Sequence, residues 1–215
     1  MRPFTLWTDR MERWAVIDFE TTGMSPFEGA RATEIGIAVL ENGQIVDRYQ
    51  SLMNAGVRIP NFIEELTGIS NAMIRKAPPA EVVMREAAAF VGDCPLIAHN
   101  AAFDSKFWDA ELMRIGLRRQ QAFACSMLLS RRIFPDAPSH KLSTLVRYAA
   151  LPVTGAFHRA LADAEMTAHL LASLCASLSE QHGLTTVSHE LLCRLQRTPK
   201  QKLPSFITHY KTQGA

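Results

Sequence analysis

The order of strand-like and helix-like segments constrains the fold of this chain more than any other feature of its sequence. Two apolar segments, 14–20 and 33–40, have the length and composition of buried strands. Asn42-Gly43 then gives a strong hairpin signal into a third segment, 44–53. Three strands that follow one another in this way predict an antiparallel meander at the start of the domain.

Beyond the meander, strands and helices alternate along the chain. Short strands are expected at 96–98 and 123–125, and helices at 60–68, 78–91, 103–115, 126–134, 141–149, 159–178 and 188–196. The end of the chain, rich in lysine and interrupted by prolines, is expected to be irregular. This order predicts an α/β domain with a mixed central sheet of about five strands flanked by helices.

The composition is that of an ordinary globular protein. A chain of 215 residues with 47% hydrophobic residues can bury a core without disulfide staples. Its four cysteines are far apart and form no CxxC pair, which favours free thiols in a reducing compartment over a zinc site. Charged residues interrupt the first 14 residues, and no apolar stretch is long enough to cross a bilayer. The expected location is the cytoplasm.

The net charge of +2 hides an uneven distribution along the chain. No acid follows Glu190, whereas five lysines and arginines do, so this end carries +5 and the rest of the chain carries −3. A basic segment attached to an acidic body is compatible with an enzyme that acts on a polyanion.

Asp18 and Glu20 are the first residues that suggest chemistry. In a strand, the side chains of residues two apart point to the same face, so both carboxylates converge on one spot. They lie at the carboxyl end of an apolar strand, where α/β sheets place their ligands. Carboxylate oxygens in such a pair favour Mg²⁺ or Mn²⁺, although an isolated pair of this kind is more often a solvated strand end.

Two further acids and a histidine follow in the sequence. Asp104 lies where a strand passes through a tight turn into a helix, a position at which an N-cap is an equally good explanation. His158 and Asp163 are five residues apart, and that spacing turns two helical positions about 140° away from each other. Asp163 is therefore expected inside the helix facing the sheet, with His158 on the turn before it.

Four carboxylates and one histidine from these separate segments can line a single cleft. Two metal ions about 4 Å apart stabilise the attacking and the leaving oxygen of a displacement at phosphorus. A histidine, which titrates near neutral pH, can take the proton from the attacking water. The predicted chemistry is metal-dependent hydrolysis of phosphodiester bonds.

The motifs resemble those of the DEDDh, or DnaQ-like, exonucleases. The matching segments are Asp18–Gly23, His99–Asp104, His158 with Asp163, Glu34–Gly36, Leu66–Ile69 and His140–Leu145. They occur in the order of the family and span about residues 13–175. The resemblance implies a ribonuclease H-like fold. We expect the exonuclease domain at 1–180 and, outside the resemblance, a basic C-terminal tail at 181–215.

The resemblance also implies an activity and its residues. The family releases 5′-mononucleotides from a 3′ end, here of DNA single strands or frayed ends. By correspondence, Asp18, Glu20, Asp104 and Asp163 hold two divalent metal ions, Mg²⁺ or Mn²⁺, and His158 is the general base. The terminal nucleotide would lie close to Thr21, Thr22, Gly23, Thr67, His99 and Phe103, although Phe103 fits a core position equally well.

Several alternatives stay open at the level of the sequence. The same fold and site serve exoribonucleases of the RNase T and oligoribonuclease branches, and nothing in the sequence reads the 2′-hydroxyl. A non-catalytic nucleic-acid-binding subunit of a polymerase would have lost some of the five polar residues, and all five are present. A polymerase or a sliding clamp is a further candidate partner, because Gln201–Phe206 faintly resembles clamp-binding peptides.

Overall fold

The computed structural model describes residues 13–213. Residues 1–12, on which the prediction about the N-terminal segment rests, and residues 214–215 lie outside the described part. Within the described part, no helix is long and apolar enough to cross a membrane.

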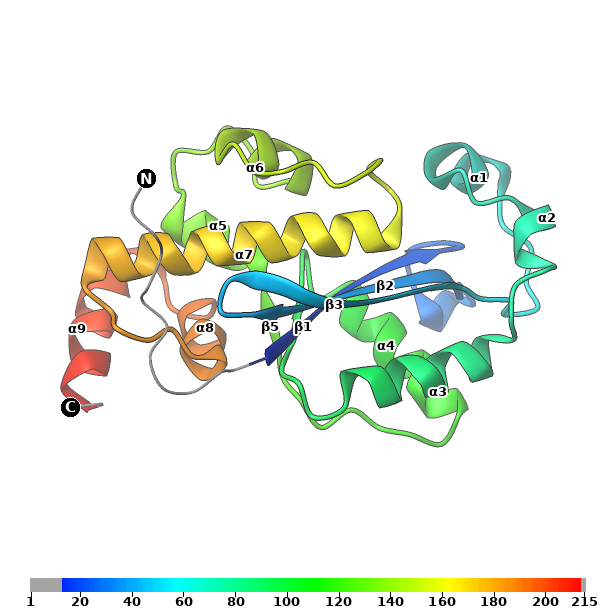
Figure 1. Cartoon of the computed structure of the whole chain (residues 1–215), viewed down its shortest axis with the longest axis horizontal. Coiled ribbons are helices and arrows are strands. Elements are labelled where there is room, and N and C mark those ends of the chain that lie inside the picture. The colour runs from blue at the N-terminus through cyan, green and yellow to red at the C-terminus, as the bar shows by residue number, and fades with distance from the viewer. Residues whose placement is uncertain (1–12, 214–215) are drawn as a thin grey trace.

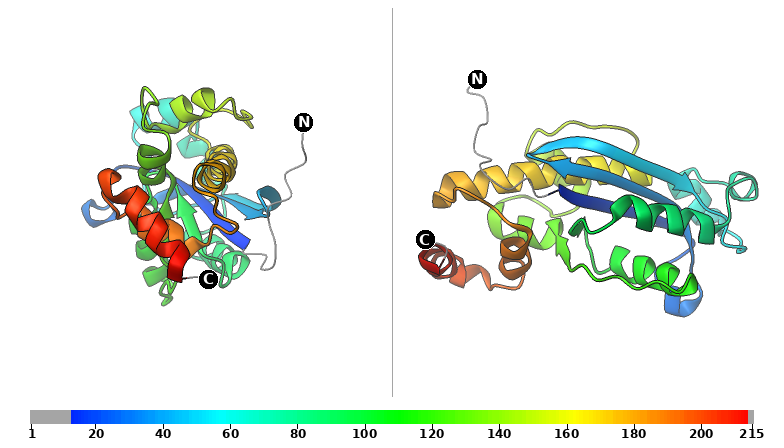
Figure 2. Two further views of the ribbon diagram at one scale, coloured as in Figure 1. Left: turned by 90° about the vertical axis from the view of Figure 1, so that its left-hand side faces the viewer. Right: turned by 60° about the horizontal axis from the view of Figure 1, so that its bottom comes forward.

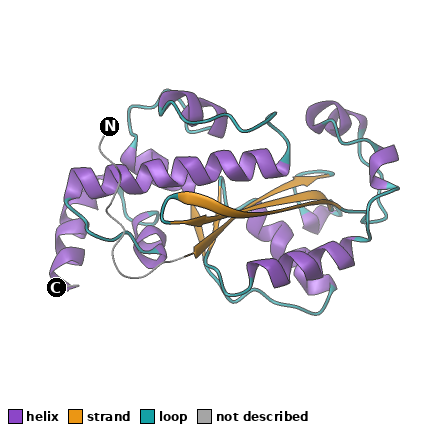
Figure 3. Cartoon of the chain, in the orientation of Figure 1, coloured by secondary structure: helices purple, strands orange, loops and turns teal. Residues whose placement is uncertain are grey.

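A five-stranded mixed sheet forms the centre of the molecule (Figure 1, Figure 3). The strands are β1 (Arg13–Thr21), β2 (Ala32–Glu41), β3 (Gln44–Leu52), β4 (Leu96–Ala98) and β5 (Phe123–Cys125). Their order in the sheet is β3-β2-β1-β4-β5, with β1, β2 and β3 antiparallel and with β4 and β5 parallel to β1. The predicted meander and the predicted mixed sheet of five strands are both confirmed.

Helices cover both faces of the sheet. They are α1 (Asn61–Thr67), α2 (Asn71–Ile74), α3 (Ala80–Val91), α4 (Asp104–Arg114), α5 (Ser126–Ile133), α6 (Leu142–Tyr148), α7 (Ala160–His182), α8 (His189–Leu195) and α9 (Leu203–Gln213), with short 3₁₀ turns η1 (Pro26–Glu28) and η2 (Lys200–Lys202). The long α7 lies along one face, and α3 and α4 lie on the other (Figure 2). α2, the 3₁₀ turns and α9 were not predicted.

The alternation of side chains along β1 divides the core in two. Trp14 and Val16 pack with α5, α6, α7 and the C-terminal helices, whereas Ala15, Ile17 and Phe19 pack with α3 and α4. Because the period of a strand is two, Asp18 and Glu20 continue the face that carries Trp14 and Val16. The sequence of β1 alone therefore directs both carboxylates toward α7.

Gly36 allows α7 to come close to the sheet. It lies on β2 directly opposite Asp18 of β1. A Cβ atom on residue 36 would be 2.2 Å from the backbone carbon of Ala160 and 2.2 Å from the backbone nitrogen of Leu161. Only glycine fits at this crossing, so the start of α7 rests directly on the backbone of β2.

The residues after α7 pack against the rest of the domain. Leu191, Leu192, Leu195, Leu203 and Ile207 are buried in the same core cluster as α7. The side-chain amide of Gln196 extends the sheet at β5, because its Oε1 accepts from the Cys125 N–H at 2.6 Å and its Nε2 donates to the Phe123 carbonyl at 3.0 Å. The basic C-terminal segment is thus a folded pair of helices on the edge of the sheet.

Candidate active site

Asp104 reaches the acid pair from the neighbouring strand. It is the first residue of α4, immediately after the turn that follows β4, and its side chain is buried. Its Oδ1 accepts a hydrogen bond from the backbone N–H of Phe19 at 3.2 Å, between Asp18 and Glu20 on β1. The carboxylate is therefore held beside the acid pair by a contact to another strand, and it is not the N-cap of its own helix.

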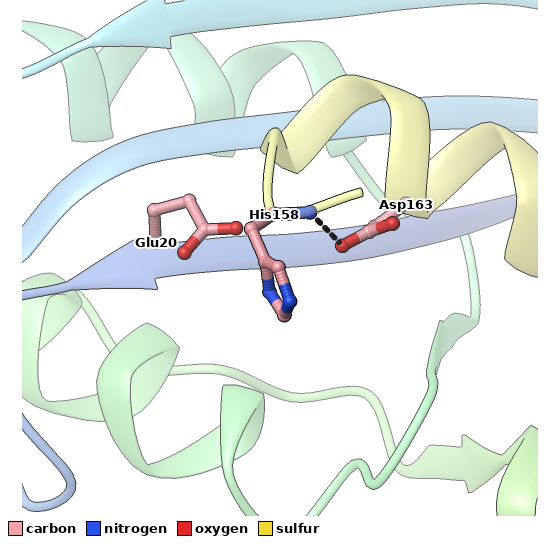
Figure 4. Close-up of side chains that lie close together, drawn as sticks. All are labelled: Glu20, His158 and Asp163. Atoms are coloured by element: carbon pink, nitrogen blue, oxygen red, sulfur yellow. Dashed lines mark hydrogen bonds between the residues drawn. The ribbon is translucent and has the colours of Figure 1, made fainter. Parts of the chain in front are cut away.

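His158 and Asp163 lie on either side of the start of α7 (Figure 4). As predicted, Asp163 is inside the helix and His158 is on the turn before it. His158 has a left-handed backbone with φ of 63°, and its N–H donates to Asp163 Oδ2 at 3.1 Å. One ligand atom from each of Glu20, His158 and Asp163 lies within 4.8 Å of the other two. The imidazole of His158 is exposed, whereas the two carboxylates are almost buried.

A fifth carboxylate, Glu34, fixes the start of α7. Its side chain is buried on β2, opposite Glu20 of β1. Its oxygens accept from Arg159 Nη2 at 2.8 Å, Arg159 Nε at 3.1 Å and the Ala160 backbone N–H at 3.1 Å. Gln50 donates a further hydrogen bond at 2.8 Å. Glu34 had been recognised only as part of a family segment, and the spacing Glu34-Ile-Gly36 places it on the face of β2 that meets α7.

The four carboxylates of the site repel one another and are poorly hydrated. Burial raises the pKa of Glu20 to about 8, and the charge of Asp163 adds to the rise. Burial likewise raises the pKa of Asp104 to about 8, although the hydrogen bond from Phe19 works against it. The pKa values of Asp18 and Asp163 are also raised, chiefly by burial and, for Asp18, by the charge of Asp104. The charge of Arg159 lowers the pKa of Glu20, but it does not outweigh burial and the neighbouring carboxylates.

These residues fit divalent metal ions. Asp163 Oδ1 is a buried oxygen with no hydrogen-bond partner in the described part of the chain, which is costly unless a cation or water takes that place. All four acids offer hard oxygen ligands, the set that Mg²⁺ and Mn²⁺ prefer. Two carboxylates that share a site stay ionised at neutral pH when a cation lies between them.

The three threonines predicted to contact the nucleotide make side-chain hydrogen bonds within the protein. Thr21 Oγ1 donates to the Gly23 carbonyl at 2.7 Å, and Thr22 Oγ1 accepts from the Arg31 N–H at 3.0 Å. Thr67 is buried at the end of α1, where its hydroxyl donates to the Ile63 carbonyl at 2.8 Å. The threonine hydroxyls thus shape the loops.

His99 and Phe103 lie on the turn between β4 and Asp104. The Nε2 of His99 lies 3.0 Å from the carbonyl oxygen of His140, which can only accept, so this nitrogen carries the proton. Its Nδ1 lies 2.8 Å from Ser126 Oγ and accepts from that hydroxyl. Burial lowers the pKa of His99 to about 4, so the ring is neutral at pH 7. Phe103 is partly buried against Phe107, with ring centroids 5.0 Å apart.

Comparisons with known proteins agree with this geometry. The RNase T family model, described as Exonuclease, matches residues 15–171. The 3′-5′ exonuclease DinG of Bacillus subtilis is 32% identical in an alignment 212 residues long that covers 91% of this chain and 22% of that protein. A PolC-type DNA polymerase III of Halalkalibacterium halodurans is 34% identical over 169 residues, 78% of this chain and 12% of the polymerase. The chain therefore spans less than a quarter of the length of these curated relatives.

Solved structures show the same fold. Exonuclease X in complex with 5′-overhanging duplex DNA is 25% identical, with a TM-score of 0.66 over 85% of this chain and 99% of that one. The nuclease domain of 3′hExo, a DEDDh family member bound to rAMP, is 20% identical, with a TM-score of 0.66 over 82% of this chain and 96% of that one. Family model, relatives, fold and the cluster of acids with its histidine agree, and the chain belongs to the DEDDh exonuclease family.

Proposed function

We propose that this chain is a 3′-5′ exonuclease that removes 5′-mononucleotides from the 3′ ends of DNA single strands or frayed duplexes. The observation that carries the proposal is the convergence of four uncompensated carboxylates with one exposed histidine at the carboxyl ends of β1 and β4. All five residues of the predicted catalytic set are present in the sequence, and Glu20, His158 and Asp163 offer ligand atoms within 4.8 Å of one another.

In this proposal Asp18, Glu20, Asp104 and Asp163 hold two divalent metal ions, Mg²⁺ or Mn²⁺. Bound there, the ions neutralise charge that develops on the attacking and leaving oxygens of the phosphodiester. The protein contributes a fixed set of ligands. β1 positions Asp18 and Glu20 on one face, the Phe19 N–H holds Asp104, and the Arg159 carbonyl accepts from the Asp163 N–H at 3.0 Å.

His158 acts as the general base. Its backbone, not its ring, makes the hydrogen bond to Asp163, so the imidazole is left to accept a proton from the attacking water (Figure 4). The left-handed turn directs the ring toward the side where Glu20 and Asp163 converge. A positioned base of this kind contributes about 10²–10⁴-fold to rate.

The terminal nucleotide would lie against the loop of Thr21, Thr22 and Gly23 and against Thr67, His99 and Phe103. Because the hydroxyls of Thr21 and Thr67 make hydrogen bonds within the protein, both segments would contact the nucleotide through their backbone. DNA is the proposed substrate on the similarity to the DinG exonuclease and PolC-type polymerases. An RNA substrate is the alternative, since the 3′hExo nuclease domain binds rAMP.

A polymerase is the proposed partner on the PolC similarity alone. Docking of Gln201–Phe206 on a sliding clamp is disfavoured by its packing. Leu203 is buried, and Phe206 packs against the core and faces Arg194 and Tyr210. Both side chains would have to leave the core to reach a clamp.

The test uses 5′-labelled DNA and RNA oligomers with Mg²⁺ or Mn²⁺. We expect a ladder of products shortened from the 3′ end with DNA, a loss of at least about 10²-fold in Asp18→Ala and His158→Ala, and no loss in Asp93→Ala, an exposed acid after α3. An unchanged ladder in Asp18→Ala would refute the metal assignment, and a ladder on RNA alone would refute DNA as the substrate.

A further inference from the structure

The surface beyond β5 is strongly basic and lies outside the proposed catalytic machinery. Between residues 184 and 213 the only acid is Glu190, which pairs with Arg194 at 3.7 Å. Arg197, Lys200 and Lys202 are all exposed, and none of these three side chains has a hydrogen-bond or ion-pair partner within residues 13–213. Together with Arg131 at the end of α5, we refer to these four cations as the basic ridge.

The two parts of the ridge lie side by side. The guanidinium of Arg132 donates to the carbonyl of Thr198 at 2.8 Å and to that of Leu128 at 2.7 Å. This contact joins the last turn of α5 to the connection between α8 and η2. Arg132 is thus used to hold the fold. Its neighbour Arg131 is exposed, with Nη2 3.8 Å from Met127 Sδ, and the cations around Thr198 are exposed as well.

The ridge is held rigidly. Gln196 is bonded to both ends of β5, and Arg194 stacks on Phe206 at 5.4 Å and on Tyr210 at 5.6 Å from the ring centroids. Leu195 and Leu203, which flank the three C-terminal cations, are buried. A flexible solvated tail would present no fixed arrangement of charge, whereas this segment does.

A cavity is lined by sequence neighbours of the active-site residues and of the ridge. α5 begins at Ser126, which is bonded to His99, and Arg131 lies about 8 Å further along the helix axis. The cavity has a volume of about 280 Å³ and is lined in part by Asn100, Ser105, Phe123, Leu128 and Gln196. Asn100 and Ser105 adjoin His99 and Asp104, while Gln196 belongs to the connection that carries the ridge. Its size is near the lower limit of small-ligand pockets, about 300 Å³, which suits a single flat ring.

We propose that the cavity and the basic ridge bind the strand upstream of the scissile bond, with a base in the cavity and its phosphodiester backbone along Arg131, Arg197, Lys200 and Lys202. This proposal rests on the proposed function, because it assigns the course of that enzyme's substrate. Phosphates are the charge-complementary partner of exposed lysines and arginines. Phe123, with the Arg119 guanidinium 5.1 Å from its ring centroid, gives the cavity an aromatic wall against which any base can pack.

The test separates the ridge from the chemistry by using two substrates. The p-nitrophenyl ester of thymidine 5′-monophosphate reports the active site alone, whereas a 20-nucleotide single strand also reaches the ridge. The test variant is R197E/K200E/K202E. The matched control is R75E/K76E/R118E, which changes the net charge equally at exposed residues outside the ridge.

We expect both variants to hydrolyse the small ester like the wild type. For the 20-mer, the slope of log Kobs against log salt should fall by about 2 in R197E/K200E/K202E, since each phosphate contact on a single strand contributes about 0.7. The control should keep the wild-type slope. Leu128→Trp, at the wall of the cavity, should raise KM for the 20-mer and leave the ester unaffected.

An unchanged slope in R197E/K200E/K202E, or an equal fall in the control, would refute binding of the strand along the ridge. An unaltered KM in Leu128→Trp would refute binding of a base in the cavity. Failure of the proposed function has a different signature. In that case the wild type hydrolyses neither substrate, whatever the salt dependence of its binding.

Discussion

Replacing Gly36 with alanine tests how closely the site depends on the crossing of α7 over the sheet. The new Cβ would be 2.2 Å from the backbone of Ala160 and Leu161. An ordinary contact needs about 3.4 Å, so the start of α7 or the centre of β2 must move by about 1 Å. Backbone cannot rotate away as a long side chain would, and overpacking of this kind costs about 1–3 kcal/mol of stability.

The displacement necessarily reaches the active site. If α7 moves, it carries His158 and Asp163, and if β2 moves, it shifts away from its partner residue Asp18. Either way the carboxylates separate, and a misplacement of about 1 Å can reduce the rate about 10²-fold. We expect the kcat for the p-nitrophenyl ester to fall by that factor, with a smaller change in KM, because the loss is one of alignment.

Gly116→Ala is the matched control. Gly116 follows α4 with φ of 75° and has open space around its would-be Cβ, so alanine there is strained but not crowded. It lies at the opposite end of α4 from Asp104. This variant should lose about 1 kcal/mol and keep its kcat. Wild-type kcat and Tm in Gly36→Ala would show that the close crossing does not hold the site together.

Two further perturbations address charge. Burial raises the pKa of Glu20 and Asp104 to about 8, above the ordinary value near 4, so the native state binds more protons than the unfolded chain between these values. The metal-free protein should therefore lose stability as the pH rises from about 5 to 8, and Mg²⁺ or Mn²⁺ should restore that stability. In thermal denaturation, Asp104→Asn should remove part of the dependence of Tm on pH. A Tm of the metal-free protein that does not change with pH would contradict this. Glu34→Ala should cost about 2 kcal/mol, less than a fully buried pair because the Arg159 side chain is 38% exposed, and Glu34→Gln should cost less. Equal stability of Glu34→Ala and the wild type in urea denaturation would refute the anchoring role.

Local rules account for much of the site. The period of two along β1 predicted that Asp18 and Glu20 share a face, and helical geometry predicted that His158 lies outside the helix that holds Asp163. Both conclusions depend only on residues close in sequence. Asp104 was ambiguous because the same residue at a helix start suits a cap, and its hydrogen bond to Phe19, 85 residues away, decides the matter.

The features that sequence reasoning missed depend on distant contacts or on competing local signals. Glu34 meets Arg159 across 125 residues, and no local pattern predicts that pairing. The helix α9 was missed because Pro199 and Pro204 suggested an irregular end. Pro204 lies in the first turn of α9, where proline is tolerated because its missing N–H would have no partner. α2 spans four residues, too few for a helical period to show.

Glu34 also explains why the acid cluster stays uncompensated. Arg159 lies close enough to Glu20 to lower its pKa and is the natural counter-ion for the site. Instead, its guanidinium is held in a two-point contact by the buried Glu34 carboxylate, at 2.8 and 3.1 Å. An arginine free to bind Glu20 or Asp163 would compete with divalent cations for the same oxygens. By engaging Arg159, Glu34 both fixes the start of α7 and leaves the negative charge of the site for metal ions to neutralise.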